Sequence, residues 1–213
     1  MNNIWFSSDY HFNHKNIIKY ENRPFKNVEE MNRVIIQKHN ERVKEKDIVY
    51  FLGDWGFYAS KNKAFRGEGL PNRVKKLKDK MKGNFVSIRG NHDKLSNKIN
   101  IANHRVILNK GGIYINLVHR PTDTIISDEQ YYYPLTLCGH VHGKWKTKEI
   151  ENNKIALVVN VSVETNNYYP YSFDEIMVIY WKWLNKHPRK KEILKWIEQS
   201  KYKQPFIKLK DIK

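Results

Sequence analysis

Five short apolar runs in this sequence each lead into residues that bind metal ions or move protons. The clearest is residues 85–88, followed through Gly90 by an amide, an imidazole and a carboxylate, Asn91, His92 and Asp93. Such groups are costly to place at the end of a buried strand unless something polar is bound there. The other four runs share this form: Asp9 and His11 follow residues 4–6, Asp54 follows residues 48–52, His119 follows residues 113–118, and His140 and His142 follow residues 135–138. The pattern predicts one polar site assembled from several strand ends.

The order of strands and helices favours an α/β fold. Asn27 followed by Glu30 has the pattern of a helix-capping box, and Met31, Val34 and Ile35 then form an apolar helical face between two strand-like runs. A strand, a helix and a second strand in this order favour a right-handed parallel crossover. Ligands of an open α/β sheet gather beyond the carboxyl ends of its strands, so the polar residues are expected to meet there.

The remaining elements are predicted from apolar spacing and turn residues. We expect a short helix over residues 15–20, a helix over residues 71–81 capped by Gly83, a hairpin of residues 105–108 and 113–118, a strand over residues 155–163, and C-terminal helices opened by a capping box of Ser172 and Glu175. Residues 1–180 are predicted to form one domain, and residues 181–213 a basic helical extension packed on it or appended to it.

The net charge of +17 raises the question of a nucleic-acid partner. Residues 182–213 carry eleven Lys and Arg against three Asp and Glu, a balance of 11 − 3 = +8. A nucleic-acid contact and an ordinary lysine-rich solvated surface both account for this charge. No RNA- or DNA-binding module signature is present, so both interpretations stay open.

The sequence shows no pattern typical of an exported or membrane-spanning protein. A single cysteine, Cys138, excludes an internal disulfide. No signal-peptide pattern and no apolar run of 18 residues occurs, so no membrane contact is expected. We therefore expect a cytoplasmic protein, of an oligomeric state that the sequence leaves open.

The order Asp-x-His, Gly-Asp, Gly-Asn-His-Asp, His, Gly-His-x-His, between residues 4 and 175, closely resembles the calcineurin-like metallophosphoesterase superfamily. Residues 8–18 and 22–25 resemble a narrower subset of small phosphoesterases within it. The resemblance implies a four-layer α/β sandwich, in which two facing mixed β-sheets are flanked by helices, with the C-terminal helices appended.

The resemblance also implies a dinuclear metal centre. Its ligands would be Asp9, His11 and His142 for the first ion and Asn91, His119 and His140 for the second, with Asp54 bridging both and His92 left as the catalytic group that protonates the leaving oxygen or binds phosphate. Two such ions acidify a bridging water and clamp the phosphate. Carboxylate, imidazole and amide ligands suit Mn²⁺, the expected ion, and also Fe, Zn or Ni.

Six further residues are weaker candidates, each with a structural role as the alternative. Asp93 would fix its loop, Arg120 would bind phosphate, Asn160 would support the ligands, and His14, Asn16 and Arg23 would reach the substrate. One position departs from the family pattern: Phe57 stands where many relatives carry an aspartate that orients the catalytic histidine.

The expected activity is hydrolysis of a phosphoester, of the nucleotide-type phosphodiester or phosphomonoester kind, by a metal-bridging hydroxide. Two alternatives remain. One is a nucleic-acid-binding protein or nuclease that uses the basic C-terminal region. The other is a metal-binding scaffold without catalysis.

Overall fold

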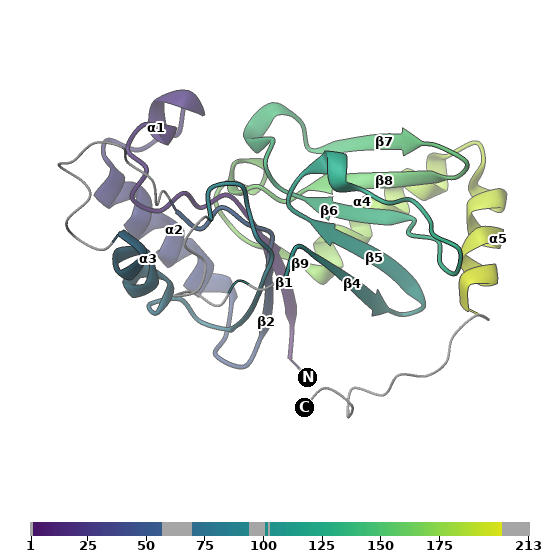
Figure 1. The fold of residues 1–213 in the computed structure, drawn as a ribbon, viewed down its shortest axis with the longest axis horizontal. Coiled ribbons are helices and arrows are strands. Elements are labelled where there is room, and N and C mark those ends of the chain that lie inside the picture. The colour runs from purple at the N-terminus through teal and green to yellow at the C-terminus, as the bar shows by residue number, and fades with distance from the viewer. Residues whose placement is uncertain (1, 57–69, 94–100, 102, 202–213) are drawn as a thin grey trace.

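The computed structural model describes residues 2–56, 70–93, 101 and 103–201, and consists of two β-sheets with helices packed against them (Figure 1). The first sheet has the strand order β3 (Asn84–Ser87), β2 (Ile48–Phe51), β1 (Ile4–Ser7) and β9 (Tyr171–Ser172). The second has the order β4 (Arg105–Lys110), β5 (Ile113–Val118), β6 (Leu135–Cys138), β8 (Ile155–Asn160) and β7 (Thr147–Glu151). The helices are α1 (Ile17–Tyr20), α2 (Val28–Arg42), α3 (Leu70–Lys78), α4 (Phe173–Lys186) and α5 (Lys190–Lys201).

Both sheets are mixed, as expected. β1, β2 and β3 run parallel, so α2 lies in the predicted parallel crossover, and β9 pairs antiparallel with β1. β5, β6 and β8 are parallel, while β4 and β7 are antiparallel edge strands. The predicted hairpin of β4 and β5 is confirmed, and its turn uses Gly111 and Gly112 at φ 64° and 78°. Two consecutive positive φ values are typical of the tight hairpin turn that favours glycine.

Successive residues of the first sheet face two different cores. Phe51 of β2 packs with Met31 and Ile35 of α2 and Val74 of α3. The preceding residue, Tyr50, packs against the core that holds side chains of the second sheet. The first sheet is therefore covered on both faces.

The caps of α2 and α4 follow the sequence pattern. The Asn27 side chain accepts a hydrogen bond from the Glu30 amide at 2.8 Å, although the Glu30 carboxylate binds the amide of Lys26 instead of that of Asn27. Ser172 and Glu175 form the complete reciprocal box, with bonds of 3.1 and 2.8 Å.

Three predicted boundaries shift. α3 ends at Lys78, and Gly83 lies beyond it at φ 95°, in a turn where a Cβ would collide with Val43 and Val49. α1 begins at Ile17, and β8 ends at Asn160 because the Asn160 side chain accepts the amide of Ser162 and turns the chain. Phe57 and the rest of residues 57–69, like residues 94–100, lie outside the described residues.

The C-terminal helices share a core with both sheets. α4 runs without a break across residues 180 and 181, the expected domain boundary. Its Tyr180 and Leu184, and Ile193 and Ile197 of α5, belong to the same core cluster as Phe6 of β1. Both helices thus pack on the core that the two sheets share. In the part of the chain that the structure describes, no helix has the length and apolar character to cross a membrane.

A buried histidine ties α2 to the first sheet. His39 accepts a hydrogen bond from the Tyr10 hydroxyl at 3.0 Å and donates one to the Lys82 carbonyl at 2.9 Å, and its ring stacks on Phe85. Burial lowers the pKa of His39 to about 4. The neutral ring is therefore the form that the folded state holds.

This burial predicts a loss of stability in mild acid. The unfolded histidine titrates near pH 6.5, so its contribution is complete above that pH and is lost as the pH falls toward 4, with an upper limit of about 3 kcal/mol. Urea unfolding between pH 4.5 and 7.5 should show a steeper loss for the wild type than for His39→Gln, which cannot titrate. Parallel stability curves for the two proteins would contradict this assignment.

Candidate metal centre

The loops that follow β1 and β2 are joined by backbone hydrogen bonds. The amide of Asp9 donates to Gly53 at 2.9 Å, and that of His11 donates to Asp54 at 3.0 Å. In the second sheet the amide of Gly139 binds the His119 carbonyl at 2.9 Å. The predicted strand ends therefore converge, and the site lies where the two sheets meet.

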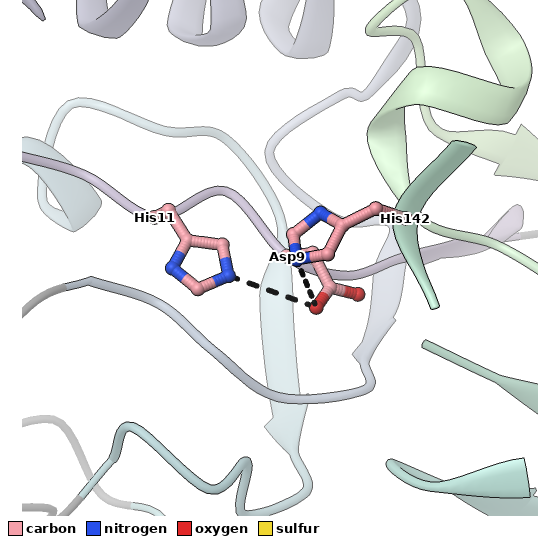
Figure 2. A group of neighbouring side chains, drawn as sticks. All are labelled: Asp9, His11 and His142. Carbon is pink, nitrogen blue, oxygen red and sulfur yellow. Dashed lines mark ion pairs between the residues drawn. The ribbon is translucent and has the colours of Figure 1, made fainter. Parts of the chain in front are cut away.

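The first group of ligand-type side chains is Asp9, His11 and His142 (Figure 2). Their candidate ligand atoms all lie within 4.8 Å of one another. Asp9 Oδ1 is 3.8 Å from His11 Nε2 and 3.9 Å from His142 Nε2. Asp9 and His11 follow β1, whereas His142 comes from the loop after β6, so both sheets contribute to this group.

The second group is Asp54, His119 and His140, again with ligand atoms within 4.8 Å of one another. His119 Nε2 lies 3.4 Å from Asp54 Oδ2 and 2.9 Å from Asn91 Oδ1. The other nitrogen of His119 donates to the backbone carbonyl of Leu52 at 2.8 Å, which turns Nε2 toward the carboxylate. Asn91 thus adds an amide oxygen to this group.

Asp54 lies between the two groups. Its Oδ2 is 3.6 Å from His11 Nε2 and 3.4 Å from His119 Nε2, while Oδ1 accepts the His92 amide at 2.8 Å. Burial opposes its ionisation, but the hydrogen bond and the charge of His119 hold the pKa of Asp54 well below its usual value. One buried carboxylate is therefore shared by two sets of imidazoles.

The residues fit a pair of divalent cations. Asp9 Oδ1 and His11 Nε2 are buried and have no hydrogen-bond partner among the described residues, and both belong to the first group. Burial lowers the pKa of His11 well below its usual value, which keeps the ring in the neutral form that binds metal. Carboxylate oxygen, imidazole nitrogen and amide oxygen together suit Mn, Fe, Zn or Ni.

Five of these residues have a left-handed backbone. The φ angles are 59° at Asp9, 52° at His11, 62° at Asp54, 72° at His140 and 48° at His142. This conformation is uncommon for residues other than glycine and is concentrated at functional sites. The sharp turns bring consecutive polar side chains back toward the strand ends.

Two glycines allow close approach to the carboxylates. A Cβ on Gly90 would collide with Asp54 Oδ1, and one on Gly139 would collide with Asp9 Oδ2. These positions therefore require a residue without a side chain.

Asp93 and Asn160 hold the loops. The Asp93 carboxylate accepts the amides of Asp54, Trp55 and Gly90 at 2.8, 3.0 and 2.9 Å. Burial and the nearby charge of Asp54 raise the pKa of Asp93 to about 6. Asn160 donates from Nδ2 to the carbonyls of His142 and Trp145 at 2.6 and 2.7 Å. Both side chains are hydrogen-bonded to the backbone of loops that carry ligand-type residues.

His92 and His14 lie beside the two groups. The His92 ring centroid is 5.2 Å from that of His11 and 6.3 Å from that of His14. His14 Nδ1 is 3.4 Å from His11 Nδ1, so His14 contacts the side of His11 that faces away from Asp9. Both side chains are partly exposed, as is needed for a group that meets a substrate.

The other three candidates differ in exposure. Asn16 and Arg120 are exposed, and Asn16 precedes α1 without a side-chain cap bond. Arg23 is buried, with its guanidinium bonded to Glu164, the Asp9 carbonyl and the Tyr10 carbonyl. Arg23 thus binds the backbone beside the first group, which corresponds to the structural alternative to reaching the substrate.

Sequence reasoning missed three residues that hold the first group. Ser8 and Ser162 place their hydroxyls 2.6 and 2.9 Å from Asp9 Oδ2, and Glu164 binds His142 at 3.0 Å. Ser162 and Glu164 follow β8, a sixth strand that ends in polar residues. Extending the strand-end pattern past Asn160 makes both residues candidates, but their partners Asp9 and His142 lie far from them in the chain.

The chain matches one family model and resembles two proteins of unknown function. The model of the calcineurin-like phosphoesterase family matches residues 3–209, which extends past the motifs between residues 4 and 175. An uncharacterised protein of Methanocaldococcus jannaschii, MJ1445, is 40% identical over 182 residues, covering 83% of this chain and 90% of that protein. The crystal structure of AQ665 from Aquifex aeolicus, of unknown function, superposes with a TM-score of 0.62 and 25% identity, covering 84% of this chain and all of that one. The chain belongs to the calcineurin-like phosphoesterase family.

Proposed function

We propose that this protein hydrolyses a phosphoester at a centre of two divalent metal ions, with Mn²⁺ as the expected ion. The observation that carries the proposal is the position of Asp54, within 3.6 Å of an imidazole of each ligand group. Asp9, His11 and His142 would hold one ion, Asn91, His119 and His140 the other, and Asp54 both. Two bound ions would lower the pKa of a water molecule and neutralise charge on the phosphate.

Side chains in and around the ligand groups would bind the ions, donate a proton and contact the phosphate. Asp9 and Asp54 supply fixed negative charge for the cations, and Asp93 holds the backbone of Asp54 in place. His92 lies beside His11 without belonging to either ligand group, and we assign it the protonation of the leaving oxygen or the binding of phosphate. Arg120, exposed next to His119, would contribute a further donor to a phosphoryl oxygen.

Hydrolysis of bis-p-nitrophenyl phosphate and of p-nitrophenyl phosphate tests the proposal. The protein stripped of metal should be inactive, and added Mn²⁺ should restore release of p-nitrophenolate from at least one substrate. The relative rates would separate diesterase from monoesterase activity. A protein that binds two Mn²⁺ ions and hydrolyses neither these nor a panel of nucleotides would favour the non-catalytic scaffold.

A nucleotide-type substrate is favoured by one exposed ring at the site. Tyr20 of α1 is 67% exposed, and its ring lies 6.2 Å from that of His14, which in turn lies 5.4 Å from that of His11. An exposed aromatic ring beside histidines of the site suits stacking of a nucleobase. Nucleotides or short oligonucleotides are therefore our proposed substrate class.

The positive charge of the C-terminal segment supports nucleic-acid binding less directly than Tyr20 supports a nucleotide substrate. Part of the expected tail serves the fold, since Ile193 and Ile197 are core residues and Arg189 pairs with Glu151 and Glu192. A salt titration of DNA and RNA binding would test it, because phosphate contacts give an affinity that falls steeply with salt.

Asp54→Asn should remove metal from the centre. The substitution keeps the shape of the side chain but removes the charge shared by both groups, so occupancy of at least one site should fall. Metal analysis by inductively coupled plasma mass spectrometry measures the stoichiometry. Two ions per chain together with full activity would contradict the bridging role.

His92→Asn should slow turnover while leaving both metals bound. General acid catalysis is worth roughly 10²–10⁴ in rate, and we expect the lower end because Phe57 replaces the usual orienting aspartate. The loss should be large for a ribose leaving group and small for p-nitrophenolate, which leaves unaided. Equal losses for both would assign His92 to phosphate binding, and loss of metal would make it a ligand.

Tyr20→Ala should weaken nucleotide binding selectively. Stacking of one base contributes about 1–3 kcal/mol, so KM for a nucleotide substrate should rise by roughly 5- to 150-fold. Tyr20→Phe retains the ring and serves as the matched control. Steady-state kinetics on the nucleotide and on bis-p-nitrophenyl phosphate would show the effect. An unchanged nucleotide KM would remove Tyr20 from the substrate site.

A further inference from the structure

Glu164 is a nearly buried carboxylate behind the first ligand group. Its Oε1 lies 3.0 Å from His142 Nδ1, and 3.0 and 2.6 Å from two nitrogens of Arg23. Because Oε1 accepts two hydrogen bonds from Arg23, the same oxygen is also the acceptor toward His142, and the shared proton lies on Nδ1 of His142.

This tautomer leaves the other nitrogen of His142 as an acceptor. His142 Nε2 is turned toward Asp9 Oδ1, at 3.9 Å, on the side where the first group converges. A carboxylate that accepts from a ligating histidine fixes the orientation of the ring and raises its basicity as a ligand. In the second group the corresponding nitrogen of His119 donates to the backbone carbonyl of Leu52. The two groups therefore differ in the strength of this support.

Arg23 links Glu164 to the backbone of Asp9 and Tyr10. Its five N–H donors are all engaged: Nε and one Nη2 hydrogen on Glu164, the other Nη2 hydrogen on the Asp9 carbonyl at 2.7 Å, and the Nη1 hydrogens on the Tyr10 carbonyl and Met31 sulfur at 3.0 and 3.3 Å. The side chain is fully buried. A guanidinium in this state has no donor left for a phosphate.

The carbonyls that Arg23 binds lie in the strained turn. Asp9 and His11, on either side of Tyr10, have φ angles of 59° and 52°. The planar fork of arginine spans these carbonyls and the carboxylate at once, which a lysine with a single nitrogen cannot do. The buried Arg23–Glu164 ion pair thus fixes the turn after β1 relative to His142, which follows β6 of the second sheet.

We propose that Arg23 and Glu164 are positioning residues that set the metal affinity of the first group. Glu164 holds His142 in the Nδ1–H tautomer, and Arg23 holds both Glu164 and the turn that carries Asp9 and His11. The inference rests on the proposed dinuclear centre, and it assigns the pair to one ion and not to the other.

Titration of the metal-free full chain with Mn²⁺ in a calorimeter tests this. The wild type should bind two ions. Glu164→Gln and Arg23→Lys should each weaken one binding event by about 10–100-fold and leave the other unchanged. The control is Glu175→Gln, which removes the same charge from a half-exposed pair with Arg42 and should change neither affinity. Equal weakening of both sites, or wild-type affinities in both variants, would overturn the proposal.

The tautomer of His142 gives a second readout, independent of activity. Long-range ¹H–¹⁵N NMR on the metal-free wild type should show the proton on Nδ1 of His142, and Glu164→Gln should redistribute it. A wild-type ring with a proton on Nε2 and none on Nδ1 would overturn the proposal even if the variants failed to fold. A wild type that binds two Mn²⁺ ions but hydrolyses nothing would contradict the proposed function and leave this inference standing, whereas fewer than two ions would contradict the centre itself.

Discussion

The constraint on which the site depends is the left-handed backbone at its ligand residues. Asp9, His11, Asp54, His140 and His142 all occupy a region that costs about 1–3 kcal/mol for a residue with a side chain. In an extended continuation of each strand, alternate side chains would point to opposite faces of the sheet. The sharp turns instead bring aspartate and histidine side chains together over the strand ends.

Such a backbone persists only where its surroundings hold it. The β1 and β2 loops exchange backbone hydrogen bonds, and the Asp93 carboxylate binds three amides around Asp54. At Asp9, donors from both sheets converge on Oδ2, through Ser8, Ser162 and the His140 amide, and leave Oδ1 facing the first group. These hydrogen bonds therefore occupy Oδ2 and leave the buried Oδ1 without a partner among the described residues, as a metal ligand requires.

The geometry of the site depends on how the two sheets pack against each other. Ligands from β1 and β2 meet ligands from β5 and β6, so any shift between the sheets would change the distances in both groups. The core that joins the sheets also contains α4 and α5. The C-terminal helices thus contribute to the site indirectly, through the position of the second sheet.

Sequence reasoning found the ligand-type residues because they directly follow apolar strands, a local pattern that survives without the fold. It placed the parallel crossover, the hairpin and both helix caps for the same reason. Glu164 escaped it, since its importance comes from Arg23 and His142, 141 and 22 residues away in the chain. The sequence leaves the packing of the C-terminal helices open between a packed and an appended extension, because it does not show which surface an apolar face such as that of Ile193 and Ile197 covers. Long-range contacts carry little signal in a single sequence.

A crystal of the protein grown with Mn²⁺ and measured at the manganese absorption edge tests the central claim most directly. The account predicts two anomalous peaks, one among Asp9, His11 and His142 and one among Asn91, His119 and His140, with Asp54 in contact with both. A single peak, or a second peak that does not contact Asp54, would contradict the shared carboxylate on which the proposed chemistry depends.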